Sequence, residues 1–70
     1  MSYNTIILEK RDSVAKLALN RSEVLNAIDK QMISELVDAV ENLKRDPEVR
    51  VVVLTGIGKA FSSGGDLAFY

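Results

Sequence analysis

The sequence predicts an α/β fold in which an N-terminal β-hairpin leads into a βαβ unit. Two short β-branched and apolar runs flank a polar turn near the N-terminus, and a stripe of apolar residues with helical spacing follows. After the stripe comes an uninterrupted apolar run, Val51 to Leu54. The order strand, helix, strand is typical of two parallel strands that are joined by a crossover helix.

The hairpin is expected between residues 5 and 19. Residues 5–9 are rich in β-branched and apolar side chains, and residues 11–13, Arg-Asp-Ser, supply the polar chemistry of a turn. Residues 14–19 then alternate in polarity, which predicts a second strand with one buried face. The residues expected on that face are Ala15, Leu17 and Leu19.

A helix is expected to begin after Asp29, because the carboxylate of this residue can accept hydrogen bonds from the first free N–H groups of a helix. Asp46-Pro47 is expected to end it. The apolar residues between these signals recur at spacings of three and four, which predicts a single stripe that faces the core. The stripe consists of Ile28, Met32, Ile33, Leu36, Val37, Val40 and Leu43.

The run from Val51 to Leu54 is expected to be a strand that is covered on both faces, as parallel strands are. A loop rich in glycine and serine follows it, at the sheet end where α/β proteins bind ligands. The loop does not fit a P-loop, which requires glycine where Val53 stands, or a dinucleotide fingerprint, which requires glycine where Phe61 stands.

Two interpretations of Ser62-Ser63-Gly64-Gly65-Asp66 remain open on local chemistry. This segment is either a flexible connection in which Asp66 caps a helix, or an oxyanion hole in which the Gly65 N–H faces a substrate carbonyl. A nucleophilic role for Ser62 or Ser63 is disfavoured, because the chain contains no histidine to activate a hydroxyl. Asn26-Ala27 is most simply interpreted as a turn that enters the helix.

Composition excludes several classes of site. The 70 residues contain neither cysteine nor histidine, so no disulfide framework, thiolate zinc site or histidine-based triad is present in them. With a net charge of −1, the chain has no basic patch large enough to indicate nucleic-acid binding. No apolar run is long enough to span a membrane. We therefore expect a cytoplasmic protein with no nucleic-acid or membrane partner.

Three segments together resemble the crotonase superfamily, the enoyl-CoA hydratase/isomerase family. They are residues 19–28, Leu-Asn-Arg-Ser-Glu-Val-Leu-Asn-Ala-Ile, then Met32, Glu35 and Leu36, and then residues 51–67, which include Leu-Thr-Gly-Ile-Gly-Lys-Ala-Phe-Ser-Ser-Gly-Gly-Asp-Leu. The resemblance covers nearly the whole chain in order and spacing. It implies the N-terminal part of a crotonase-like (ClpP/crotonase) spiral fold, with residues 1–70 as an incomplete segment of one domain.

The resemblance also implies functional residues and partners. Gly65 would supply a backbone N–H to the oxyanion hole, and the Ser63 backbone carbonyl would meet the adenine of coenzyme A. The activity implied is that of an enoyl-CoA hydratase, which adds water to 2-enoyl-CoA thioesters; enoyl-CoA isomerase, acyl-CoA hydrolase, naphthoyl-CoA synthase and a non-catalytic interaction module are the alternatives. The substrate would be an acyl-CoA thioester, with coenzyme A as part of the substrate and no separate metal or redox cofactor. Members generally assemble as trimers or hexamers, and their acid/base glutamates lie beyond residue 70. The residues implied at the acyl-CoA site are Ala27, Ser63, Gly64, Gly65, Asp66 and Leu67.

Overall fold

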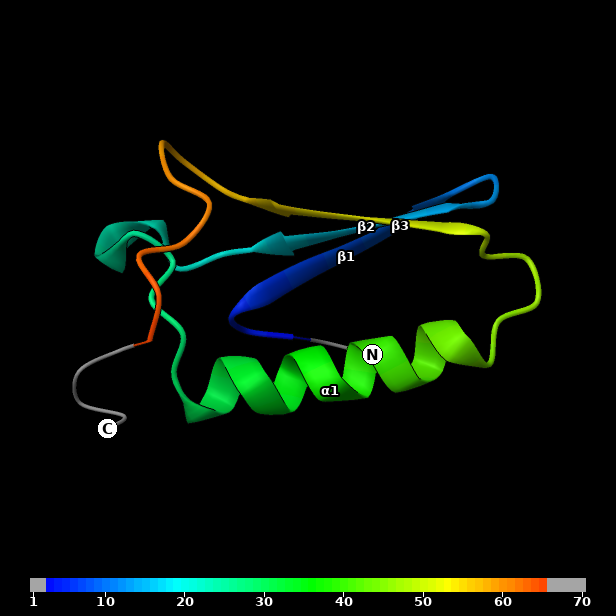
Figure 1. Ribbon diagram of the computed structural model, residues 1–70, viewed down its shortest axis with the longest axis horizontal. Helices are drawn as coiled ribbons and strands as arrows, with labels where there is room; N and C mark the ends of the chain where they lie inside the picture. Colours follow the sequence, from blue (N-terminus) through cyan, green and yellow to red (C-terminus); the bar gives the residue numbers. More distant parts are fainter. Residues whose placement is uncertain (1–2, 66–70) are drawn as a thin grey trace.

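The computed structural model describes residues 3–65, and these form a three-stranded sheet with one long helix against it (Figure 1). The strand order is β1-β2-β3, with β1 antiparallel to β2 and β2 parallel to β3. This arrangement confirms the hairpin followed by a βαβ unit. The elements are β1 (Ile6–Arg11), β2 (Val14–Leu19), a 3₁₀ helix η1 (Ser22–Val24), α1 (Lys30–Lys44) and β3 (Val51–Gly56).

The hairpin turn is tighter than the polar tripeptide suggests. Arg11 pairs with Val14, so Arg11 belongs to β1 and only Asp12 and Ser13 connect the strands. Asp12 has φ of 55°, in the left-handed region that two-residue hairpin turns require and that Asp tolerates better than most residues. The turn therefore fixes the register of both strands.

Helix α1 begins where the sequence indicates. The Asp29 side chain accepts a hydrogen bond from the Met32 N–H at 2.9 Å, which satisfies one of the free donors of the first turn. The helix ends at Lys44 with Arg45 as its C-cap, directly before Asp46-Pro47. Both ends of the helix are thus set by local sequence.

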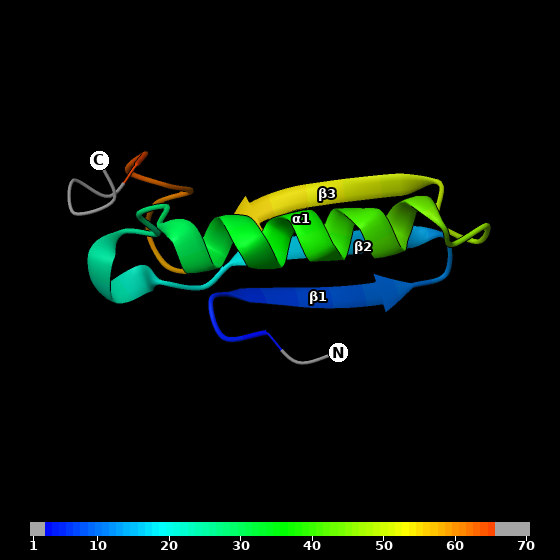
Figure 2. The same cartoon turned by 90° about the horizontal axis from the view of Figure 1, so that it is seen from below.

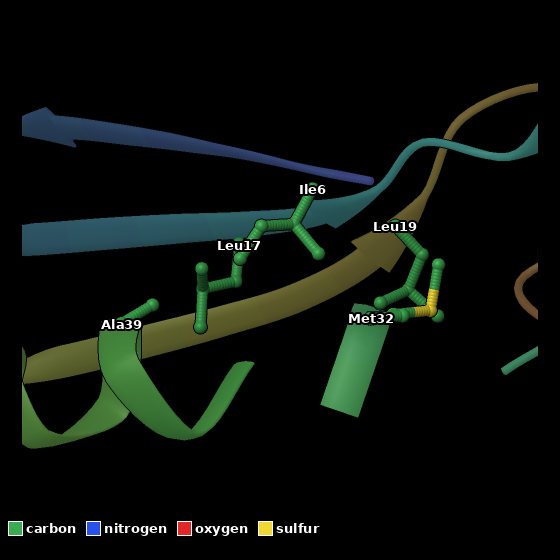
Figure 3. Packing of buried hydrophobic residues seen from close by; sticks show 5 residues of the cluster. All are labelled: Ile6, Leu17, Leu19, Met32 and Ala39. Atoms are coloured by element: carbon green, nitrogen blue, oxygen red, sulfur yellow. The ribbon is translucent and has the colours of Figure 1, made fainter. Parts of the chain in front are cut away.

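The core lies between α1 and the face of the sheet that carries the alternate residues of β2 (Figure 3). Its buried members are Ile6, Leu17, Leu19, Met32 and Ala39. Leu36 and Leu43 pack against this cluster, whereas Ile33, Val37 and Val40 remain 39–58% exposed. The predicted stripe was therefore too wide: the helix buries the side that contains Ala39, and part of the apolar stripe lies outside the core.

Glu35 ties the segment before β1 to the middle of α1. Its Oε1 accepts hydrogen bonds from the Thr5 N–H at 2.8 Å, the Thr5 hydroxyl at 3.0 Å and the Asn4 N–H at 2.9 Å. Burial opposes ionisation of this carboxyl, but the hydrogen bonds from Thr5, Gln31 and Asn4 outweigh it and lower the pKa of Glu35. The ionised carboxylate therefore stabilises the fold.

Glu35→Gln is expected to reduce stability at neutral pH by about 1 kcal/mol, because charge-assisted hydrogen bonds become neutral ones. A carboxyl whose pKa is lowered by folding stabilises the protein above its ordinary pKa and loses this effect as the pH falls through the folded pKa. Urea unfolding at several pH values should show a smaller acid loss in Glu35→Gln than in the wild type. Glu9→Gln, at an exposed position of β1, is the control. Equal acid losses in all three proteins would contradict this role for Glu35.

Strand β3 does not have the two covered faces that the sequence predicts. Its residues Val51, Val52, Val53 and Leu54 are 44–52% exposed, because α1 runs along β2 (Figure 2) and β3 is the last strand of the sheet. Within the described residues, β3 pairs only with β2. An uncharged, apolar edge strand is a template for further strand pairing.

We expect the 70-residue chain to self-associate through β3 as its concentration rises. Val53→Lys should reduce this association, because a charge on an edge strand disfavours pairing with a second copy. Ile7→Lys places the same charge at an exposed apolar position of β1 and should have less effect. Light scattering after size exclusion, over a concentration series, measures the difference. A monomer at all concentrations would contradict the expectation.

Candidate functional site

Two loops meet at one end of the molecule, beyond the carboxyl ends of β2 and β3 (Figure 1). The first, residues 20–29, connects β2 to α1, and the second, residues 57–65, follows β3. The second loop carries the predicted oxyanion segment up to Gly65. Asp66 and Leu67, which the resemblance also places at the acyl-CoA site, lie outside the described residues.

The first loop reverses direction after η1. Leu25 and Asn26 both have left-handed backbones, with φ of 54° and 55°. Asn adopts this conformation at little cost, whereas Leu does so rarely. The Asn26 N–H donates to the Arg21 carbonyl at 2.8 Å, which closes the turn. The reversal directs Ala27 and Ile28 toward the second loop.

Ala27 is 8% exposed, and both of its backbone polar groups have partners within the first loop. Its N–H donates to the Val24 carbonyl at 3.1 Å, and its carbonyl accepts from Arg21 Nη1 at 2.6 Å. The same Arg21 nitrogen lies 3.2 Å from Asp29 Oδ2. Arg21 therefore connects Ala27 to the N-cap of α1.

The second loop turns sharply directly after β3. The Ile57 N–H donates to the Leu19 carbonyl at 2.8 Å, which extends the pairing of β2 and β3 by one bond. A Cβ atom at Gly56 would collide with the Phe61 carbonyl oxygen and lie 2.7 Å from both the Ala60 carbonyl oxygen and the Phe61 Cα. Only glycine allows the chain to fold back so closely over the end of the strand.

Hydrogen bonds between main-chain groups join the two loops. The Ser63 N–H donates to the Leu25 carbonyl at 2.9 Å, and the Ile28 N–H donates to the Gly64 carbonyl at 2.8 Å. Ile28 and Gly65 form a parallel bridge. The loops therefore continue the parallel pairing of β2 with β3 beyond the ends of those strands.

This pairing determines which way the Gly65 N–H points. The Gly64 carbonyl and the Gly65 N–H belong to one planar peptide unit, and the chain has no cis peptide bond. In a trans unit the carbonyl and the N–H point in opposite directions. Because the Gly64 carbonyl faces Ile28, the Gly65 N–H faces away from the first loop.

Gly64 has φ of +97°, which favours glycine, and open space surrounds the position where its Cβ would lie. Ser63 is exposed, and Gly64 and Gly65 are half-buried. The structure thus brings Ala27, Ser63, Gly64 and Gly65 together at one end of the sheet. Part of the predicted site therefore consists of neighbouring backbone groups.

Asn26 is the important residue that the sequence interpretation missed. It was assigned only to a turn, yet it is fully buried, and its side chain bonds to backbone groups of both loops. The one available signal was indirect. A glycine-rich loop leaves many backbone groups in need of partners, and an asparagine side chain offers both donors and an acceptor.

Residues 3–65 contain neither a metal-binding cluster nor a membrane-spanning helix. No group of three or more carboxylate, histidine or cysteine side chains is placed to hold a metal ion there. In the same part of the chain, no helix has the length and apolar character needed to cross a membrane.

Comparison with known proteins identifies relatives along almost the whole chain. The family model for enoyl-CoA hydratase/isomerase matches residues 9–69. A crotonyl-CoA hydratase from Syntrophomonas wolfei is 43% identical over 70 residues, which is 99% of this chain and 27% of the relative. A 3-hydroxyisobutyryl-CoA hydrolase from Arabidopsis thaliana is 42% identical over 67 residues, 96% of this chain and 18% of the relative.

The fold agrees with solved structures. An enoyl-CoA hydratase/isomerase from Xanthobacter autotrophicus Py2 superposes with a TM-score of 0.92 and 40% sequence identity, over 96% of this chain and 25% of that protein. The chain spans about a quarter of the length of this structure and of the crotonyl-CoA hydratase. The agreement confirms that the sheet and helix match part of a crotonase structure, and the chain belongs to the enoyl-CoA hydratase/isomerase family.

Proposed function

We propose that the chain forms the thioester-binding part of an enoyl-CoA hydratase-type active site. In this proposal the Gly65 N–H donates a hydrogen bond to the thioester carbonyl oxygen of a 2-enoyl-CoA. The observation that supports it is the Ile28–Gly64 hydrogen bond of 2.8 Å, which turns the Gly65 N–H away from the first loop. Residues 1–70 would then act as the N-terminal part of one crotonase-like domain.

The proposed chemistry is the addition of water across the α,β double bond. The hydroxyl group of water bonds to the β-carbon, and the electrons of the double bond move toward the thioester carbonyl. Negative charge therefore develops on the carbonyl oxygen until a proton is delivered to the α-carbon. A fixed N–H that faces this oxygen stabilises the transition state by about 3–4 kcal/mol, the typical effect of one oxyanion-hole donor.

Other groups are proposed to come from outside this chain. These are the second oxyanion donor and the carboxylates that move protons, since the 70 residues contain no histidine and the family resemblance places the glutamates further along. Assembly as a trimer or hexamer is part of the same proposal. The residues proposed to line the coenzyme A site are Ala27, Ser63, Gly64, Asp66 and Leu67, with the Ser63 carbonyl facing the adenine.

Thioester hydrolysis is the second candidate, because the Arabidopsis hydrolase is almost as similar to the chain as the crotonyl-CoA hydratase is. Hydrolysis also places negative charge on the thioester oxygen, so the same N–H would serve it. Hydration is preferred because the Syntrophomonas relative is named a crotonyl-CoA hydratase and the Xanthobacter structure is named an enoyl-CoA hydratase/isomerase.

A chimera tests the proposal. The 70 residues replace the matching segment of the Syntrophomonas crotonyl-CoA hydratase, to which they are 43% identical. We expect the chimera to hydrate crotonyl-CoA, while the 70-residue chain alone shows no turnover above buffer. Loss of absorbance of the conjugated thioester measures the rate, and circular dichroism checks folding. A well-folded chimera without turnover, or turnover by the chain alone, would contradict the proposal.

A further inference from the structure

The Asn26 side chain holds backbone groups of both loops at once. Its Oδ1 accepts a hydrogen bond from the Arg21 N–H at 2.7 Å, and its Nδ2 donates to the Ile57 and Ala60 carbonyls, each at 2.9 Å. Since two carbonyl oxygens face the same atom, that atom must be the amide nitrogen. The residue is fully buried, so these bonds are shielded from water.

The Asn26 backbone reaches the predicted oxyanion segment through Ser62. The Ser62 hydroxyl donates to the Asn26 carbonyl at 2.9 Å, and its oxygen accepts from the Gly64 N–H at 3.0 Å. The Gly64 carbonyl in turn accepts from the Ile28 N–H. Both polar groups of Gly64 are therefore tied to residues 26–28, one directly and one through the serine.

We infer that Asn26 and Ser62 form a clasp, defined as these two residues and their hydrogen bonds, that positions the Gly64–Gly65 peptide. They are positioning residues, because they act on the reaction only through the direction of the Gly65 N–H. The catalytic consequence rests on the proposed function. The structural consequence, a locally rigid Gly64–Gly65 peptide, does not depend on it.

Few side chains could replace Asn26 and keep its hydrogen bonds. An aspartate would place a carboxylate oxygen against two carbonyl oxygens and bury a negative charge. An alanine would leave the Arg21 N–H and the Ile57 and Ala60 carbonyls without their partner. At Ser62, by contrast, threonine keeps the hydroxyl and alanine removes it, which provides a matched pair of variants.

Amide hydrogen exchange of the 70-residue chain tests the clasp. In the wild type we expect the N–H groups of Ile28, Ser63 and Gly64 to be protected. Asn26→Asp should lower protection at these three sites at least about tenfold, while Leu17 in β2 keeps its protection. Ser62→Ala should lower mainly the protection of the Gly64 N–H, and Ser62→Thr should restore that protection. Rapid exchange of all three sites in the wild type would overturn the clasp.

If Asn26→Asp unfolds the whole chain, the comparison of Ser62→Ala with Ser62→Thr tests the clasp instead. Unchanged Gly64 protection in Ser62→Ala would overturn the clasp, and selective loss that Ser62→Thr restores would support it. In the chimera, Ser62→Ala should lower kcat about five- to tenfold with little change in KM, the effect expected when one supporting hydrogen bond is lost. Complete loss of kcat would overturn the positioning role and indicate a nucleophile.

The two measurements separate this inference from the proposed function. Loss of Gly64 protection in Ser62→Ala without a change in kcat supports the clasp and argues against Gly65 as the oxyanion donor. An active chimera in which Ser62→Ala changes neither protection nor kcat leaves the proposed function in place and overturns the clasp.

Discussion

Gly65→Pro in the chimera is expected to lower kcat about 100- to 1,000-fold, the usual effect of removing one oxyanion-hole donor. Proline has no backbone N–H, so the substitution removes the one group within these 70 residues that is proposed to contact the thioester oxygen. The effect should fall mainly on kcat, because the hydrogen bond strengthens as charge develops on that oxygen. Steady-state hydration of crotonyl-CoA measures it.

Gly65→Ala is the matched control. It adds a single methyl group and retains the N–H, so we expect it to keep turnover within about tenfold of the unsubstituted chimera, far above the proline variant. Circular dichroism and thermal unfolding must show that both variants are folded. Equal turnover of Gly65→Pro and Gly65→Ala in folded protein would exclude the Gly65 N–H as the oxyanion donor.

The second large effect is expected at Gly56, where no activity needs to be assumed. Gly56→Ala places a Cβ atom 2.7 Å from the Ala60 carbonyl oxygen and the Phe61 Cα, and both are backbone atoms that cannot rotate away. The second loop must therefore move, which weakens the bonds from Asn26 Nδ2 to Ile57 and Ala60. We expect a loss of about 1–3 kcal/mol in the free energy of unfolding, the usual cost of overpacking.

Urea unfolding of the 70-residue chain at low concentration measures this loss. Gly64→Ala is the comparison, because its Cβ would meet no atom within 4 Å and only the φ of +97° opposes it. Strain of that kind costs about 1–2 kcal/mol, and it should leave exchange at residues near Ile57 unchanged. If Gly56→Ala proves as stable as the wild type, the close turn over β3 is wrong.

The sequence was sufficient to predict those elements whose signals lie within a few neighbouring residues. The hairpin follows from alternation within a few residues, and the start of α1 follows from Asp29, whose partner Met32 is three residues away. The width of the buried helix face was overestimated, because the three strands do not cover the side of α1 that carries Ile33, Val37 and Val40. Periodicity shows which side chains are apolar and does not show how much sheet is available to cover them.

The candidate site was only partly predictable. The glycine-rich loop was recognisable from the sequence, whereas the positive φ that favours glycine at position 64 is seen only in the structure. The role of the Asn26 side chain could not be predicted from the sequence, because its partners Ile57 and Ala60 lie 31 and 34 residues away. Hydrogen bonds over such separations depend on the assembled fold.

The long separation along the chain between the clasp residues has a consequence for the order in which the protein folds. The hairpin and α1 need only nearby residues, whereas the clasp must close a chain segment of 36 residues between Asn26 and Ser62. Closing a long segment lowers the conformational entropy of the chain before the hydrogen bonds of the clasp can stabilise it. We therefore expect these hydrogen bonds to form late in folding. The loops should therefore remain unstructured in the folding transition state. Substitutions in the clasp should speed unfolding and leave the rate of folding nearly unchanged.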